Sequence, residues 1–195
     1  MRILFVGNSF TSRNGLPGLL TALAGARGRN VEHRLISAGG ASLRQHLNAG
    51  TALAAIAEQS YDVVVLQEQS TLPAKNAARM HDSVRDFHAA IDQAGAQTAL
   101  YLTWARRNEP EKQRAITTAY ASIAAEVGAT LVPVGVVWER FLRTHDQPAL
   151  HAPTTAIRHW PAATSPRASS SSPYSAKTQS ASTYQSRAST PKPPP

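Results

Sequence analysis

Short apolar runs recur along the first 132 residues and are separated by longer segments with helical spacing. Five runs have the residue types of β-strands: Ile3–Val6, Val31–Ile36, Val63–Leu66, Thr98–Leu102 and Thr130–Val132. The third run has four aliphatic residues without alternation, which is typical of a strand buried on both faces. We therefore expect a parallel sheet that is covered by helices on both sides.

Amphipathic patterns that predict helices fill the intervals between these runs. They span Leu16–Ala26, Ser42–Gln59 with a break near Asn48–Gly50, Ala74–Ala94, Glu109–Val127 and Val136–Thr144. Strands that alternate with helices predict an α/β three-layer sandwich, here with a five-stranded parallel sheet in flavodoxin-like order. In such sheets the ligand crevice lies outside the carboxyl ends of the strands.

The composition changes abruptly near residue 153. Residues 154–195 contain 10 Ser, 6 Thr and 7 Pro among 42 residues, and they contain no Leu, Val, Phe or Met. Such a segment cannot bury enough apolar area to offset the entropy lost on ordering it. We therefore expect residues 1–153 to form the folded domain and residues 154–195 to be a disordered basic tail rich in Ser, Thr and Pro.

Charge and cysteine content narrow the classes of function. The net charge is +8, but residues 1–153 carry 15 basic and 12 acidic side chains, while the remaining five basic ones are scattered in the tail. This pattern does not predict a specific nucleic-acid surface, which would show as a basic stripe on a folded face. The absence of cysteine excludes disulfides, thiolate metal sites and a cysteine nucleophile.

Hydropathy suggests neither a membrane span nor a secretory leader. No stretch reaches the roughly 18 apolar residues that cross a bilayer. Met1-Arg2 is followed by only four apolar residues before Gly7, which is too short for a secretory apolar region. We expect a cytoplasmic protein.

Small or polar residues follow each of the first three strands directly. Ser9 comes just after the first strand, where it could act as a nucleophile with its own N–H facing an oxyanion, or could be a turn serine that bonds local backbone groups. We expect the next helix to start near Gly15. Gly39 follows the second strand, where its N–H could approach a ligand, or it could serve a strand-to-helix turn capped by Ser42.

Three polar residues, Gln67, Glu68 and Gln69, follow the buried third strand. The amide of Gln69 could donate a hydrogen bond to an oxyanion. The alternative is a polar loop exposed to water, because burying such groups without partners costs free energy.

In this order, the three strand ends resemble the SGNH (GDSL-like) hydrolase family over roughly residues 2–150. The stretch "FVGNSFT" is similar to the first block of the family, with Asn8 in place of the usual Asp. Gly39 matches the glycine of the second block. The stretch "VLQEQS" falls on the third block, usually Gly-x-Asn-Asp, with Gln67 at the Gly position and Gln69 at the Asn position.

The resemblance implies a serine esterase that works through an acyl-enzyme without metal or cofactor. It makes Ser9 the nucleophile, and it makes the N–H groups of Ser9 and Gly39 and the amide of Gln69 the oxyanion hole. The implied partners are small-molecule or carbohydrate esters. Asn8 and Trp104 are candidates for substrate binding. Trp104, which follows the fourth strand, could line the acyl or alcohol pocket or could instead belong to the core.

The family takes its catalytic base from a later Asp-x-x-His block, and this sequence contains no such block. Pro148 stands three residues before His151 and Ala156 three residues before His159, so neither histidine fits. The other histidines are expected on the surface, away from the site: His33, His46, His81, His88 and His145.

A change of reading frame after about residue 153 would explain the missing block. One choice of codons for the sequence from Pro153, read from the last base of the Pro153 codon, encodes Asp-Asp-Ser-His-Pro and then a helix start rich in small residues. On this hypothesis the chain lacks both the base and a closing apolar helix. The loss of the helix would expose a hydrophobic strip on the sheet.

Two other functions remain open at this stage. The first is a flavodoxin-like binding module without catalysis, in which the same strand-end loops hold a phosphate or nucleotide. The second is an inactive remnant whose basic tail is an interaction segment. In the first case Ser9→Ala would leave ligand affinity unchanged, and in the second, deletion of residues 154–195 would abolish salt-sensitive binding to polyanions.

Overall fold

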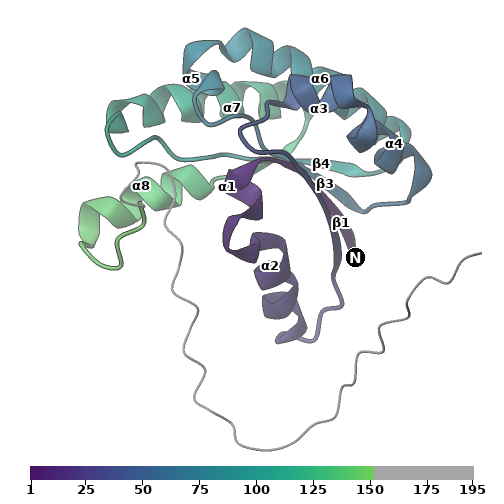
Figure 1. Ribbon diagram of the computed structural model, residues 1–195, viewed down its shortest axis with the longest axis horizontal. Helices are drawn as coiled ribbons and strands as arrows, with labels where there is room; N and C mark the ends of the chain where they lie inside the picture. Colours follow the sequence, from purple (N-terminus) through teal and green to yellow (C-terminus); the bar gives the residue numbers. More distant parts are fainter. Residues whose placement is uncertain (152–195) are drawn as a thin grey trace, which may run out of the picture. The chain divides into compact units, whose positions relative to one another are not determined.

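Five parallel strands form one sheet in the order β2-β1-β3-β4-β5 (Figure 1). The computed structural model describes residues 1–151, so the predicted tail and the proposed change of reading frame lie outside the described residues. The strands are β1 (Arg2–Gly7), β2 (Glu32–Ser37), β3 (Val63–Leu66), β4 (Gln97–Tyr101) and β5 (Thr130–Val132). The predicted α/β class, strand order and strand positions are thus confirmed.

Helices cover the two faces of the sheet unequally (Figure 1). One face carries α3 (Leu43–Ala49), α4 (Thr51–Glu58), α5 (Leu72–Lys75), α6 (Ala77–Gln93) and α7 (Gln113–Val127). The other carries α1 (Ser9–Ser12), α2 (Leu16–Gly25) and α8 (Val134–Thr144). Two short 3₁₀ turns, η1 (Arg13–Gly15) and η2 (Pro110–Lys112), precede α2 and α7. The predicted break in the second helical segment is confirmed, because Gly50 ends α3 with a φ of 72°.

Alternate residues of the central strands point into two separate cores. Leu4, Val6, Val64 and Leu66 pack under α3–α7 with helix residues such as Phe87. Ile3, Phe5 and Val65 face the other side, where they pack with Phe10, Tyr101 and Trp104. This alternation is why β1 and β3 read as continuous apolar runs.

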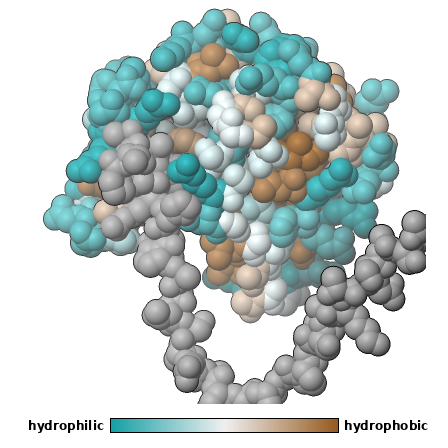
Figure 2. All heavy atoms as spheres, in the orientation of Figure 1, coloured by the Kyte–Doolittle hydropathy of each residue, from teal (hydrophilic) through white to brown (hydrophobic). Residues whose placement is uncertain are grey.

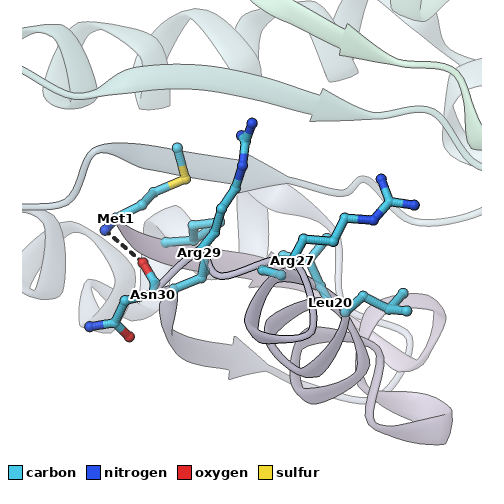
Figure 3. Close-up of a pocket in the computed structure, with 9 residues that line it drawn as sticks. Met1, Leu20, Arg27, Arg29 and Asn30 are labelled. Atoms are coloured by element: carbon cyan, nitrogen blue, oxygen red, sulfur yellow. Dashed lines mark hydrogen bonds between the residues drawn. The ribbon is translucent and has the colours of Figure 1, made fainter.

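Helix α2, on the second face of the sheet, exposes several apolar side chains. On α2, Leu19, Leu20 and Leu23 are 55%, 41% and 70% exposed. Figure 2 shows apolar side chains at the surface where α2 lies. A groove of about 920 Å³ runs beside this helix. It is bordered by Ile3, Leu20 and Leu23 and, at its polar rim, by Arg27 and Arg29 from the segment after α2 (Figure 3).

Met1 and Asn30 also line this groove. The N-terminal ammonium of Met1 donates to the carbonyl of Asn30 at 3.1 Å (Figure 3).

No helix within residues 1–151 is both long and apolar enough to cross a bilayer.

Candidate active site

Ser9 lies at the tip of β1, as the first residue of α1. The preceding residue, Asn8, is extended, with a φ of −135° and a ψ of −154°, and its side-chain oxygen accepts from the Phe10 N–H at 3.0 Å. The chain therefore turns from strand to helix within one residue. The helix predicted to start near Gly15 is confirmed as α2, which begins at Leu16, but the extra turn α1, which begins at Ser9, was not predicted. A single helical turn has no apolar period that a sequence pattern could reveal.

The strand register brings the three candidate loops to the same edge of the sheet. β1 pairs with β2 through Gly7 and Ser37, so Ser9 and Gly39 both lie two residues past a paired position. β1 pairs with β3 through Val6 and Leu66, so Ser9 and Gln69 both lie three residues past one. Because β1 is between β2 and β3, the Ser9 loop lies between the loops of Gly39 and Gln69.

The loop after β2 supports both interpretations made from its sequence. Ser42 caps α3, and its side chain and that of Gln45 form a capping box, so the predicted cap is confirmed. Gly40 has a φ of 68°, which favours glycine at the turn. Gly39 has an ordinary φ, and a Cβ there would meet no atom within 4 Å. Gly39 is also exposed to solvent.

The loop after β3 is not a water-exposed polar loop, so that alternative is wrong. Gln67 and Glu68 are fully buried. The Gln67 side-chain oxygen accepts from the Asn8 N–H and from the Thr11 hydroxyl, both at 2.9 Å. Its amide nitrogen donates to the carbonyl of Glu68. The sequence gives no sign of the contacts with Asn8 and Thr11, because these residues lie 59 and 56 positions away along the chain.

The amide of half-buried Gln69 has a defined orientation. Its oxygen accepts from the Thr71 N–H at 2.8 Å, the Thr71 hydroxyl at 3.0 Å and the Leu72 N–H at 2.9 Å. These three donors can be satisfied only by the oxygen end, so the amide nitrogen points away from them. Gln69 thus presents an N–H₂ group at the sheet edge.

Glu68 has the most perturbed carboxyl in this region. Its Oε1 accepts from the Leu43 N–H at 3.1 Å and the Gln69 N–H at 2.6 Å. Its backbone N–H donates to the Tyr120 hydroxyl at 3.1 Å. Burial raises the pKa of the Glu68 carboxyl above its ordinary value, although the two N–H donors and the more distant Arg79 partly oppose this. Burial also raises the pKa of Tyr120.

Asn8 is buried and is bonded within the protein at both ends of its side chain. Besides the oxygen that accepts from Phe10, its Nδ2 donates to the Ala41 carbonyl at 2.9 Å. The sequence pattern alone could not distinguish this arrangement from contact with a substrate.

One histidine departs from its predicted surface position. His46 is buried, and its Nε2 donates to the Gly7 carbonyl at 2.8 Å. The surface prediction for His46 is therefore wrong, because its helix turns it toward the end of β1. The half-buried ring of His151 lies edge-on to Trp138, with 5.7 Å between ring centroids, and its Nε2 donates to the Ala105 carbonyl at 3.3 Å. Within residues 1–151, no group of His, Asp or Glu side chains could hold a metal ion.

Trp104 belongs to the core of the second face and also borders a cavity. It is 4% exposed and stacks on Trp138, with 3.9 Å between ring centroids, while Phe10 lies 4.8 Å away. The cavity has a volume of about 300 Å³ and is lined largely by aromatic and aliphatic side chains. Phe10, which follows Ser9 in the chain, is one of the residues that line this cavity.

Comparison with known proteins adds an independent line of evidence. No protein-family model matches the chain, and neither does any curated protein sequence. Among solved structures, a protein from Slackia heliotrinireducens described as an SGNH hydrolase is 32% identical. That alignment covers 80% of this chain and 89% of the other, with a TM-score of 0.66.

Two further structures share the fold at lower identity. The esterase EstA from Pseudoalteromonas sp., solved in a form inhibited by monoethylphosphonate, is 18% identical with a TM-score of 0.56, over 68% of this chain and 76% of that one. A catalytic mutant of the acetylxylan esterase Axe2 from Geobacillus stearothermophilus, in which a histidine is replaced by alanine, is 14% identical with a TM-score of 0.63, over 80% and 86%. The identity to the Slackia protein extends over most of both chains, and this chain therefore belongs to the SGNH hydrolase family.

Proposed function

We propose that this chain is a serine esterase that cleaves carboxylic esters through an acyl-enzyme. The Ser9 oxygen attacks the acyl carbon, the bond from that carbon to the alcohol oxygen breaks, and the alcohol leaves with a proton. Water then hydrolyses the acyl-serine and regenerates the hydroxyl. The observation that carries this proposal is the strand register, which brings Ser9, Gly39 and Gln69 to one edge of the sheet.

The proposed oxyanion hole consists of the N–H groups of Ser9 and Gly39 and the side-chain amide of Gln69. The exposure of Gly39 supports this role, because a substrate can reach an exposed loop. The orientation of Gln69 supports it too, because its oxygen is occupied and its nitrogen is the free end. Donors that are already oriented stabilise a developing negative charge without reorganisation.

The catalytic base is the missing component. A serine hydroxyl is a weak nucleophile unless a base accepts its proton. The sequence has no Asp-x-x-His, and the Nε2 of His46 is already bonded to the Gly7 carbonyl. In Axe2, a variant with histidine replaced by alanine is named a catalytic mutant. We infer that the base is lost through a change of reading frame after about residue 153.

The exposed leucines of α2 support the same inference. The leucines of α2 and the groove beside Ile3 form an apolar surface that a further helix after α8 would cover.

The loss of the base alone lowers turnover by about 10³ to 10⁶, by analogy with the removal of members of a catalytic triad.

The proposed substrates are esters of small molecules or carbohydrates. The cavity beside Phe10 and Trp104 has the size and apolar lining of a site for an acyl or alcohol group. Axe2, which shares the fold, is an acetylxylan esterase, which keeps acetylated carbohydrates among the candidates. In this proposal Trp104 contacts the substrate. Asn8, which the sequence made a candidate for substrate binding, instead stabilises the turn at Ser9 through its own hydrogen bonds.

Labelling with a fluorophosphonate probe tests the proposal. We expect mass spectrometry to find the label on Ser9 in a chain whose frame is corrected after residue 153, and no label in its Ser9→Ala variant. The 195-residue chain should label slowly and should accelerate when imidazole is added as an external base. A folded, frame-corrected chain without label on Ser9 would refute the nucleophile assignment. The nucleotide sequence around the Pro153 codon tests the frame change separately.

A further inference from the structure

Buried hydrogen bonds connect the three loops at the sheet edge in pairs. We define the first loop as residues 7–12, the second as 37–43 and the third as 67–71. The first and second loops are connected by the Asn8 side chain, which donates to the Ala41 carbonyl. The first and third are connected by the Gln67 oxygen, which accepts from Asn8 and Thr11.

Glu68 supplies the remaining connection, between the second and third loops. One oxygen, Oε1, accepts from the N–H of Leu43 in the second loop and from the N–H of Gln69 in the third. Tyr120 in turn accepts from the backbone N–H of Glu68 and fixes the start of the third loop to α7. Each pair of loops is thus joined by at least one buried side chain.

This arrangement has a cost that an aliphatic residue at position 68 would avoid. Glu68 is fully buried, and its second oxygen, Oε2, has no hydrogen-bond partner among residues 1–151. Removing a carboxyl group from water is unfavourable unless partners compensate for the loss. Both hydrogen bonds that the Glu68 carboxyl accepts come from backbone N–H groups, and both groups belong to the loops of the proposed oxyanion hole.

We propose that Glu68 is a positioning residue that fixes the distance between the Gly39 and Gln69 donors. This inference rests on the proposed esterase function. Glu68 touches no reacting atom and transfers no proton. It acts through Leu43, four residues after Gly39, and through the backbone of Gln69 itself. Oxyanion donors must lie within a few tenths of an ångström of their working distance, so a loop that shifts loses much of their effect.

Three variants of the 195-residue chain test this role. Glu68→Leu removes both acceptor bonds at similar volume, and Glu68→Gln keeps an acceptor oxygen. Ile91→Ala is the matched control, because Ile91 is fully buried near the end of α6 that is distant from the loops. NMR measures amide exchange at Leu43 and Gln69. Fluorophosphonate labelling of Ser9, with imidazole present, measures the limiting rate and the half-saturating probe concentration.

We expect Glu68→Leu to speed amide exchange at Leu43 and Gln69 by about tenfold or more, because both N–H groups lose their acceptor. The limiting labelling rate should fall by about 10- to 100-fold, while half-saturation changes little, because the pocket is intact and the donors are displaced. Glu68→Gln should recover most of both effects. Ile91→Ala should lower global stability without a comparable loss of labelling.

Labelling of Glu68→Leu at the parent rate would overturn the proposal, as would a Glu68→Gln variant no better than Glu68→Leu. Failure of the esterase function gives a different result: the parent chain itself does not label at Ser9. In that case the exchange measurement alone decides whether Glu68 connects the loops. Unchanged exchange at Leu43 and Gln69 in Glu68→Leu would show that it does not.

Discussion

Gly7, the last residue of β1, has no room for a side chain. A Cβ at this position would lie 2.7 Å from the Gln67 oxygen and 2.8 Å from the Thr11 hydroxyl oxygen. Real Cβ atoms essentially never approach another heavy atom within 3.0 Å. The Gly7→Ala change must therefore displace the Gln67 side chain from the position in which it joins the first and third loops.

The energetic effect follows from the bonds that are lost. The Asn8 N–H and the Thr11 hydroxyl both donate to the Gln67 oxygen, and all three residues are at most 2% exposed, so water cannot replace the acceptor. A buried donor left without a partner costs about 1–3 kcal/mol, so two cost about 2–6 kcal/mol. This is a large share of the roughly 5–15 kcal/mol by which a domain is stable.

Urea unfolding with Gly18→Ala as a matched control measures this effect. Gly18 lies inside α2, where a Cβ would meet no atom within 4 Å, so this change should stabilise the chain by about 0.5–1 kcal/mol. For Gly7→Ala we expect a lower midpoint with an unchanged slope, since the surface exposed on unfolding is the same. A Gly7→Ala variant that unfolds at or above the parent midpoint would refute the contact argument.

Three other measurements address the Glu68 carboxyl, α8 and the exposed leucines. Burial raises the pKa of Glu68 in the folded state. Its contribution to the free energy of unfolding is therefore complete below about pH 4 and is lost as the pH rises through the pKa of the folded state. In urea titrations, the free energy of unfolding of Glu68→Gln should therefore rise relative to that of the parent between pH 4 and pH 8. A difference between the two proteins that does not change with pH would contradict this expectation. Gly135→Ala would bring a Cβ within 2.0 Å of the Thr103 carbonyl oxygen, and we expect calorimetry to show a Tm lower by about 6–12 °C, whereas an unchanged Tm would mean that α8 is not packed as described. Leu23→Lys should reduce self-association, measured by light scattering, while changing stability by less than about 0.5 kcal/mol. Scattering equal to that of the parent would show that this leucine does not take part in self-association.

The fold could be predicted because its determinants are local. The continuous run Val63–Leu66 and the helical spacing in residues 74–94 each specify one element, and their alternation specifies the sheet. The one-turn helices α1 and α5 were not predicted, because four residues are too few to show a period.

The site could be predicted only in part, because its determinants are not local. The positions of Ser9, Gly39 and Gln69 after successive strands are visible in the sequence, and parallel strands bring such positions to one edge. The burial of Gln67 and His46 is not visible, because their partners, Asn8 and Gly7, lie on a different strand end. Polar residues whose pattern predicts an exposed loop can therefore be buried, with side chains that hydrogen-bond the loops of a site to one another.

Under the proposed change of frame, the missing base and the exposed leucines of α2 have the same origin. In the order β2-β1-β3-β4-β5 the chain reverses direction once, so right-handed connections put α2 on one face and α3–α7 on the other. Only a segment after β5 can return to the face of α2, and α8 reaches it through Trp138 but leaves Leu20 and Leu23 exposed. A segment that continues from α8 also starts near the edge of the sheet where Ser9 needs a base. Residues 154–195 supply neither an Asp nor a Leu, Val, Phe or Met. Under the proposed change of frame, one correction restores both, so the corrected chain should label at Ser9 and also stop exposing the leucines of α2. If correction brought only one of these two changes, a single cause could not explain them both.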